Sequence, residues 1–274
     1  MIGWIIAFAV IGLTSFFIAL KYIAKSYRTK LLLQKPLDKK YITIIKQNVP
    51  LYNRLPETLK NQLHGLINVF LSEKRFEGCG GLEITDEIKV TITAQACMLL
   101  LNRKTDFFPK LKTILVYPRT YVVKQSSFDS GFITEGPSVR LGESWQNGPV
   151  VLAWDSIKGS AENIADGRNV IFHEFSHQLD QEDGFADGAP VLPSSSCYAS
   201  WAKILTAEYR KLQSDEKKGR RSVIDKYGAT NPAEFFATAT EAFFENSAKL
   251  RQKHPELYNE MKEYYKIDPA DWPN

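Results

Sequence analysis

The sequence predicts an α+β domain, mainly helical with a small β-sheet, preceded by one N-terminal transmembrane helix. Three observations predict this fold class. Residues 2–20 contain no charged side chain, apolar residues recur at helical spacing in several later stretches, and short β-rich segments lie in the middle of the 274-residue chain. We therefore divide the chain into an anchor at residues 1–21, a basic juxtamembrane linker at 22–50 and one domain at 51–274.

The uncharged run is long enough to predict a membrane anchor. At about 1.5 Å per residue it matches a hydrocarbon core about 30 Å thick. A cleaved signal peptide is the alternative, but no positive residue precedes the run and no small-residue cleavage site follows it. By the positive-inside rule, the basic residues that follow predict a single-pass protein of the cell inner membrane with its domain in the cytoplasm. These residues are Lys21, Lys25, Arg28, Lys30, Lys35, Lys39 and Lys40.

The charge distribution argues against direct nucleic-acid binding. The whole chain carries +4, but residues 21–40 hold seven basic residues and one acidic residue, so the remainder carries −2. A nucleic-acid-binding domain is expected to show a basic excess, which this domain lacks. The three cysteines, Cys79, Cys97 and Cys197, include no C-x-x-C pair. They predict no disulfide framework, as expected of a reducing compartment.

The domain begins with two predicted helices. Leucine, isoleucine and phenylalanine recur at helical spacing from Leu59 to Leu71. Glu87–Leu101 is a second, largely buried helix, with Thr85 and two acidic residues at its start.

Short strands and then further helices follow. The strands are predicted at Thr113–Val116, Tyr121–Lys124, Phe132–Thr134 and Val150–Trp154. The later helices are predicted at about Tyr198–Gln213, Pro232–Ser247 and Pro255–Tyr265.

A pair of histidines around a glutamate carries the chemistry. His173 and His177 lie four residues apart, so on a helix both imidazoles reach one metal ion. Glu174 then lies near the open coordination position, where it takes a proton from water. Asp166–Gly167 predicts the helix start just upstream. This arrangement indicates a zinc hydrolase with one zinc ion per chain. The other two histidines, His64 and His254, are interpreted as ordinary packing or surface residues.

A third ligand is expected from a later helix, because a catalytic zinc ion normally has three protein ligands. Glu234 and Glu241 lie on one face of an apolar helix that Asn231 caps and Pro232 begins. Glu234 also occupies the capping-box position, where its side chain would reach back to the cap. Spacing alone therefore leaves both glutamates open, with Glu241 as a rival ligand or as a hydrogen-bond partner of a ligand histidine. Glu245 is expected to be solvated.

Several segments together resemble the Mlc titration factor A family of zinc-dependent peptidases. The segments are Phe76–Asp86, Val90–Leu101, Ile114–Pro118, His173–His177 with its Leu-Asp tail, and Asn231–Ala237. The resemblance runs from about residue 55 to about residue 244. In the last two of these segments, the sequence is also similar to the catalytic domain of anthrax lethal factor.

The resemblance implies a role for each matching residue. His173, His177 and Glu234 become the zinc ligands and Glu174 the general base. Tyr227, seven residues before Glu234, takes the place of the family's transition-state tyrosine.

One position departs from a related pattern. Thermolysin-type enzymes place an acidic residue four positions after the ligand glutamate, where this chain has Thr238. Asp180 and Glu241 are the alternatives for an acidic partner of a ligand histidine.

The sequence therefore predicts a zincin-like metallopeptidase that hydrolyses peptides or proteins. In peptidases of this architecture the substrate commonly adds as a strand to a sheet edge, and Val150–Trp154 is either that edge or an interior strand. Two other functions stay open. The resemblance implies that some members sequester a transcriptional repressor of sugar uptake, so the chain is alternatively a protein-binding regulator. A metal hydrolase acting on a non-peptide amide or ester is the third possibility.

Overall fold

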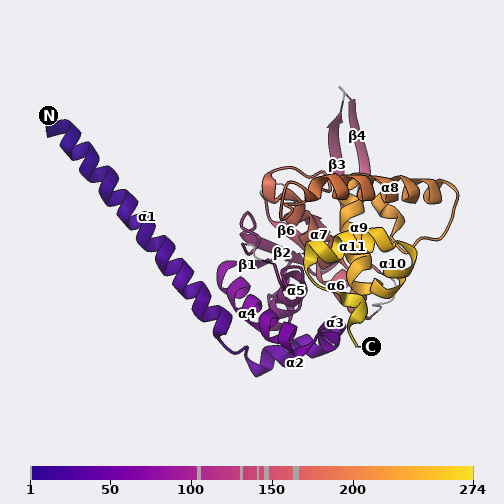
Figure 1. Cartoon of the computed structure of the whole chain (residues 1–274), viewed down its shortest axis with the longest axis horizontal. Coiled ribbons are helices and arrows are strands. Elements are labelled where there is room, and N and C mark those ends of the chain that lie inside the picture. Colours follow the sequence, from indigo (N-terminus) through magenta and orange to yellow (C-terminus); the bar gives the residue numbers. More distant parts are fainter. Residues whose placement is uncertain are drawn as a thin grey trace.

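The computed structural model describes residues 2–103, 106–129, 132–140, 142–144, 148–162 and 167–273. The chain is rich in helices, and α1 extends away from the rest of the molecule (Figure 1). The α-helices are α1 Ile2–Gln34, α2 Lys39–Asn48, α3 Pro50–Arg54, α4 Glu57–Glu73, α5 Asp86–Met98, α6 Trp154–Glu162, α7 Val170–Asp180, α8 Cys197–Lys217, α9 Pro232–Glu245, α10 Ser247–Lys253 and α11 Pro255–Tyr265. The 3₁₀ helices within these ranges are η1 Gln181–Asp183, η2 Lys226–Ala229 and η3 Pro269–Asp271.

A small mixed sheet lies against these helices. Its strand order is β1-β2-β6-β5, with β1, β2 and β6 parallel and β5 antiparallel to β6. A separate antiparallel pair is formed by β3 and β4. The strands are β1 Arg75–Gly78, β2 Thr113–Tyr117, β3 Tyr121–Asp129, β4 Phe132–Arg140, β5 Gly142–Ser144 and β6 Val150–Ala153.

The interior position of β6 decides one open question. β6 pairs with β2 on one side and with β5 on the other, and all four of its residues are buried. A strand covered on both faces reads as a continuous apolar run, as Val150–Ala153 does. The edge interpretation of this segment is therefore wrong. The short strand β5, which the sequence did not predict, forms that edge of the sheet.

Most predicted helices and strands are present. Pro255–Tyr265 is confirmed with both of its boundaries, and Pro232 begins α9 as expected. Thr85 caps α5, because its hydroxyl accepts a hydrogen bond from the Ile88 amide. The predicted Pro232–Ser247 helix ends earlier, at Glu245, and α10 follows as a separate helix. The sequence did not predict the strand β1. This strand has only four residues and begins two residues after α4 ends.

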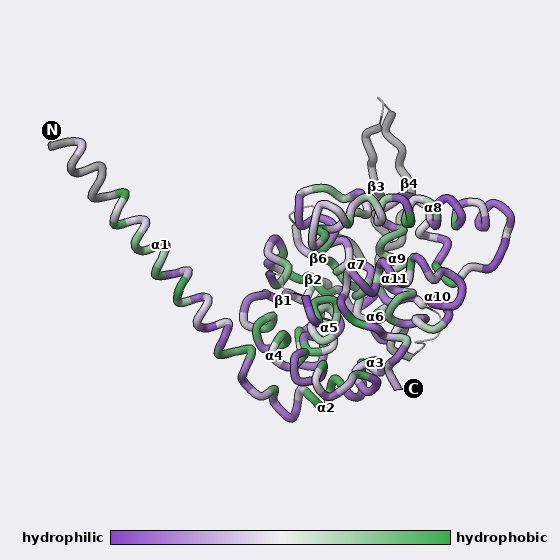
Figure 2. The backbone as a smooth tube through the Cα atoms, viewed as in Figure 1, coloured by the Kyte–Doolittle hydropathy of each residue, from purple (hydrophilic) through white to green (hydrophobic). Residues whose placement is uncertain are grey.

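The predicted membrane anchor is wrong. α1 is a continuous helix from Ile2 to Gln34. Within the described part of the chain, however, no helix combines the length and the apolar character that crossing a bilayer requires. Thr14 and Ser15 interrupt the apolar residues, and four cations follow in residues 21–30. Hydrophilic and hydrophobic residues alternate along the coloured part of the helix (Figure 2). The expected single-pass location in the cell inner membrane, and the membrane as a partner, rested on this anchor and are corrected with it.

The end of α1 docks on α4 through a close backbone contact. Gly65 faces the Leu33 backbone, and a Cβ there would clash with the Leu33 carbonyl oxygen. Asn68 Nδ2 donates to the Leu32 carbonyl at 3.4 Å and to the Lys35 carbonyl at 2.7 Å. A glycine and an asparagine on α4 therefore hold the last turn of α1.

Aromatic side chains on α7 fix that helix in the core. The Phe175 ring lies 5.0 Å from the Phe108 ring and 5.9 Å from the Phe70 ring of α4, measured between centroids. On the next helical face, Phe172 stacks on Phe244 of α9 at 4.7 Å. All of these phenylalanines are buried. α7 is thus held between the N-terminal helices and α9, which leaves little freedom for the polar residues that it carries.

Candidate metal centre

The helix α7 begins one residue after Asn169. The Asn169 Oδ1 atom accepts hydrogen bonds from the amides of Ile171 at 3.1 Å and Phe172 at 3.0 Å. Asparagine is a favoured cap because its short side chain satisfies these otherwise unpaired donors. The expected start at Asp166–Gly167 is therefore too early for the observed helix, although Asp166 itself lies outside the described residues.

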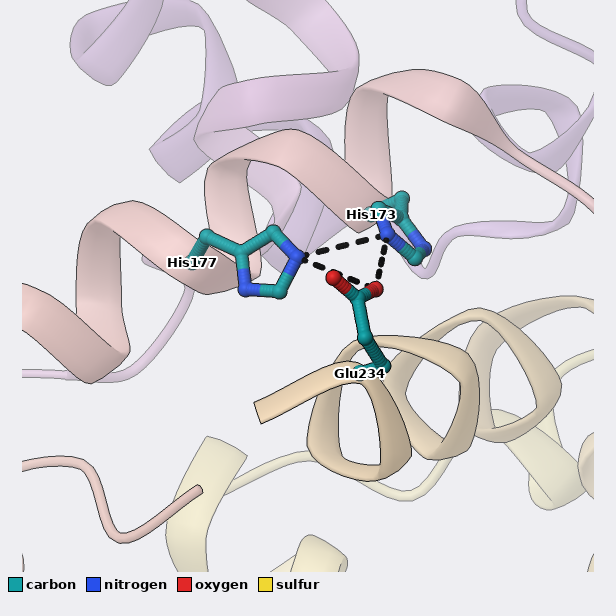
Figure 3. Close-up of side chains that lie close together, drawn as sticks. All are labelled: His173, His177 and Glu234. Carbon is teal, nitrogen blue, oxygen red and sulfur yellow. Dashed lines mark hydrogen bonds and ion pairs between the residues drawn. The ribbon is translucent and has the colours of Figure 1, made fainter. Parts of the chain in front are cut away.

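The helix α9 brings Glu234 toward α7. Asn231 caps α9 as predicted, and its Oδ1 atom accepts from the Glu234 amide at 2.9 Å. The Glu234 side chain lies against the two imidazoles, where its Oε2 atom contacts both (Figure 3). The capping position and the ligand position are thus compatible, because the backbone of Glu234 serves the cap and its carboxylate serves the site.

Three donor atoms converge between the two helices. His173 Nε2 lies 3.3 Å from His177 Nε2 and 2.9 Å from Glu234 Oε2, and His177 Nε2 lies 3.4 Å from the same oxygen. The three side chains point toward one another from α7 and α9 (Figure 3). Two ligands at about 2.0–2.1 Å from a tetrahedral zinc ion lie about 3.3–3.4 Å apart. The spacing of these donors therefore suits one small divalent ion.

The proton on His173 supports the same interpretation. Its Nδ1 atom lies 2.8 Å from the Glu241 carboxylate, which can only accept, so Nδ1 carries the proton. In a neutral ring Nε2 then presents a lone pair to the Glu234 oxygen. Two lone pairs at this distance repel each other, unless a cation lies between them or the ring gains a second proton. The chemistry of the donor set thus fits a metal ion.

The carboxylates also set the proton affinities of this site. Burial opposes the charged form of His173, but hydrogen bonds to Glu234 and Glu241 raise the pKa of His173 well above its ordinary value. Burial likewise opposes ionisation of Glu234, but its bonds to His173 and His177 lower the pKa of Glu234 to about 2. The Glu234 carboxylate is therefore ionised over the physiological pH range, and it can only accept hydrogen bonds.

A buried network supports the His173 ring from behind. Glu241 is 5 % exposed, and its Oε2 atom accepts from the Asn169 amide at 2.5 Å. The Asn169 Nδ2 atom donates to Gln95 Oε1 at 2.6 Å and to Glu245 Oε1 at 2.9 Å. Glu245 was expected to be solvated, but it is buried. Sequence reasoning missed Asn169 and Gln95. Asn169 stood just before an apolar helix, which is the signal of a cap.

The two remaining predicted site residues differ in exposure. Glu174 lies on α7 beside His173 and is 5 % exposed. Tyr227 lies in η2 and is 56 % exposed, and its ring centroid is 5.8 Å from that of His173. Asp225 Oδ1 accepts from the Tyr227 amide at 2.8 Å and fixes this turn. The position next to the tyrosine suits a glycine, because a Cβ at Gly228 would clash with the Thr238 hydroxyl.

Asp180 joins the end of α7 to the following loop. It is fully buried, and its Oδ2 atom accepts from the Gly188 amide at 3.0 Å. Burial raises the pKa of Asp180 to about 6. Gly188 itself has a φ of +78°, and a Cβ there would clash with the Pro232 carbonyl at the start of α9. Trp201 Nε1 donates to the Gly188 carbonyl at 3.0 Å.

The other two histidines lie in separate polar contacts. His64 Nε2 is 2.8 Å from the Tyr52 hydroxyl. His254 Nδ1 is 2.7 Å from Glu208 Oε2. Among the residues that the structure describes, the group His173, His177 and Glu234 is the one that offers three converging metal-ligand atoms.

Comparison with known proteins gives the family. The family model described as glucose-regulated metallo-peptidase M90 matches residues 23–266. An uncharacterized protein of Synechocystis sp. is 42% identical over 245 residues, which cover 89% of this chain and 89% of that protein.

Proteins named Mlc titration factor A are similar over most of their length. The one from Serratia proteamaculans is 31% identical over 81% of this chain and 85% of its own length. One from Escherichia coli is 32% identical over 81% of this chain and 84% of its own length. A metallo-peptidase family implies a metal ion, which the donors between α7 and α9 suit. From residue 23 to residue 266, the chain belongs to the glucose-regulated metallo-peptidase M90 family.

Proposed function

We propose that this chain is a zinc-dependent metallopeptidase, with one zinc ion held by His173, His177 and Glu234. The convergence of the three donor atoms at 2.9–3.4 Å carries the proposal. Two imidazoles and one carboxylate form a ligand set of catalytic zinc, which leaves a coordination position open. When bound, zinc supplies the Lewis acid that lowers the pKa of water to about 7.

Glu174 is the proposed general base. It follows His173 on α7 and is almost fully buried. In this position it takes a proton from the attacking water and later returns a proton to the leaving amine. A buried carboxylate serves this role well, because water around it does not compete for the proton that it carries.

Tyr227 is proposed to stabilise the developing oxyanion. Its ring lies beside His173, and more than half of the side chain is exposed. The phenol is thus open to a substrate and close to the metal ligands. A donor of this kind acts on charge that develops only in the transition state, so it raises turnover rather than substrate affinity.

The metal content and a peptide digest test the proposal together. We expect the purified full-length protein to contain one equivalent of zinc per chain by elemental analysis. It should cleave members of a peptide library, lose this activity with 1,10-phenanthroline and regain it when zinc is added back. A protein that binds no divalent metal, or cleaves equally well with the chelator present, would contradict the proposal.

A second candidate function is the binding of a regulator. Several of the similar proteins, among them those from Serratia proteamaculans and Escherichia coli, carry the name Mlc titration factor A. On this alternative the chain binds Mlc or a similar transcriptional regulator, and catalysis is secondary. Glu174→Gln separates the two functions. Peptide cleavage by the wild-type protein that Glu174→Gln abolishes supports the peptidase. Regulator binding that Glu174→Gln leaves unchanged, in a protein whose wild type cleaves no peptide, supports the alternative.

A further inference from the structure

The side chain of Asn169 joins three helices and uses all of its hydrogen-bonding groups. Its Oδ1 atom accepts from the amides of Ile171 and Phe172 in the first turn of α7. Its Nδ2 atom donates to Gln95 Oε1 of α5 at 2.6 Å and to Glu245 Oε1 of α9 at 2.9 Å. A carboxamide has two hydrogens and an oxygen with two lone pairs, so each of these has a partner. The Asn169 side chain is therefore fixed in one orientation.

Gln95 holds the α5 end of this network. It is 5 % exposed, and its neighbours Ala94 and Ala96 are fully buried. The Gln95 Nε2 atom donates to the Thr91 carbonyl, one turn earlier in α5, at 3.4 Å, while Oε1 accepts from Asn169. Burying a carboxamide in a helical core costs free energy unless hydrogen bonds offset the cost. A glutamine in this place thus indicates a role for its oxygen.

The helix α9 meets Asn169 through two buried carboxylates. Glu241 and Glu245 lie one turn apart on α9. Glu241 Oε2 accepts from the backbone amide of Asn169 at 2.5 Å, and Glu245 Oε1 accepts from its side chain. A third carboxylate here would add to the repulsion between two like charges in the core. The Gln95 oxygen is a neutral acceptor, which completes the contacts of Asn169 without adding charge.

The same contacts lead from Asn169 to the candidate metal ligands. Glu241 Oε1 lies 2.8 Å from His173 Nδ1, and Nε2 of that ring lies 2.9 Å from Glu234 Oε2. One carboxylate of Glu241 thus contacts Asn169 with one oxygen and His173 with the other. A shift of Asn169 would therefore displace the carboxylate that orients the His173 ring.

We propose that Gln95 is a positioning residue of the metal centre, which acts on His173 through Asn169 and Glu241. This inference rests on the proposed zinc site. The Gln95 oxygen holds the Asn169 side chain, and Asn169 in turn holds Glu241 against His173. A ligand that is oriented before the ion arrives loses less freedom on binding it, so a less restrained Asn169 weakens the binding of zinc.

Gln95→Met tests this role. Methionine has a similar length but no oxygen, so the Asn169 Nδ2 atom loses one of its two acceptors. We expect the affinity of the full-length protein for zinc to fall about tenfold, the lower end of the range for partners of a ligand histidine, because Gln95 acts at one remove. Competition with a chromophoric chelator measures the affinity. Wild-type affinity in this variant would overturn the inference.

Thr93 on the same helix provides a matched control. It is fully buried, and its hydroxyl has no hydrogen-bond partner within the described ranges. Thr93→Val removes this polar group from α5 and leaves the contacts of Asn169 in place, so zinc affinity should stay at its wild-type value. An equal loss in Thr93→Val would show that any change in the core of α5 weakens zinc binding, and would refute a specific role for Gln95.

A double-mutant cycle tests whether Gln95 acts through Glu241. Glu241→Gln already removes the fixed orientation of the His173 ring, so adding Gln95→Met should cause little further loss of zinc affinity. If the two losses multiply instead, Gln95 acts by another route, and the inference is wrong.

Asn169→Ser tests the same link if Gln95→Met does not fold. Serine keeps a side-chain oxygen for the start of α7 but lacks the donors to Gln95 and Glu245. Zinc affinity should again fall about tenfold, and an unchanged affinity would overturn the inference. A wild-type protein that binds no zinc would instead contradict the proposed zinc site itself, which separates the two failures.

Discussion

The Glu241 carboxylate lies 2.8 Å from Nδ1 of His173, while Nε2 of the same ring faces Glu234. The Glu241 carboxylate thus fixes the proton on Nδ1, and the Glu234 carboxylate faces the lone pair on Nε2. Glu241 also accepts the Asn169 amide at 2.5 Å, so it ties the start of α7 to the orientation of its first histidine. A histidine held in this way is a stronger metal ligand than a free imidazole.

Glu241→Gln should weaken metal binding without removing a ligand. The amide presents one oxygen for two donors, the His173 ring and the Asn169 amide, so the ring loses its fixed orientation. We expect the affinity for zinc to fall about 10–100-fold. Competition with a chromophoric chelator measures this change.

The chain offers a matched control for that variant. Glu208 and His254 form another carboxylate–histidine pair, at 2.7 Å, away from the metal centre. Glu208→Gln breaks that pair and should leave zinc affinity unchanged. Equal losses in the two variants would indicate a general loss of stability instead of a role for Glu241.

Glu174→Gln should separate metal binding from catalysis. The amide keeps the size of the side chain but cannot take a proton from water. We expect turnover of peptides to fall about 10²–10⁴-fold, with one equivalent of zinc retained. Elemental analysis and a fluorogenic peptide assay on the same sample measure both quantities. Wild-type turnover in this variant would exclude Glu174 as the base.

Tyr227→Phe should reduce turnover while the Michaelis constant and the metal content stay close to their wild-type values. The exposed ring keeps its place next to His173, but the phenolic donor is lost. We expect a decrease in kcat of about 10²–10³-fold, as for other oxyanion donors. If zinc is lost instead, the tyrosine has a structural role.

Glu234→Gln should change the acid stability of the metal-free protein. Hydrogen bonds to His173 and His177 lower the pKa of Glu234 from 4.5 to about 2. A lowered pKa in the folded state stabilises the protein above pH 4.5, and this contribution is lost as the pH falls through 2. The substitution should therefore reduce the free energy of unfolding at pH 5 and flatten its decline between pH 4.5 and 2. The reduction is on the order of 3 kcal/mol.

Urea unfolding in the presence of a chelator, at several pH values, measures this effect. Glu256→Gln on the exposed face of α11 is the control, and it should leave the pH profile unchanged. A wild-type profile in Glu234→Gln would mean that the glutamate does not interact with the two histidines in the metal-free protein.

The local parts of the site were predictable from sequence. The spacing of His173 and His177 needs only helical periodicity to bring them together, and apolar neighbours indicated a buried helix. The position of Glu234 depends on how α9 crosses α7, which no local pattern encodes. The choice between Glu234 and Glu241 stayed open from spacing alone for that reason. Both glutamates contact His173, Glu241 at Nδ1 and Glu234 at Nε2.

Local composition predicts the wrong environment for the N-terminal helix and for Glu245. An uncharged run predicted a membrane anchor, but the helix is not apolar enough over its described length to cross a bilayer. A glutamate late in a helix is usually exposed, but Glu245 is buried because Asn169 provides a donor for it. The short strands β1 and β5 carry no alternating pattern, and their partners in the sheet define them.

The contact between Gly188 and Pro232 joins α7 and α9, the helices that carry the candidate metal ligands, at a second place. Gly188 follows α7, Pro232 begins α9, and the fit admits no side chain. Because this joint consists of backbone, we expect it to hold the two helices in place without an ion. Metal uptake should then proceed with almost no rearrangement of the scaffold.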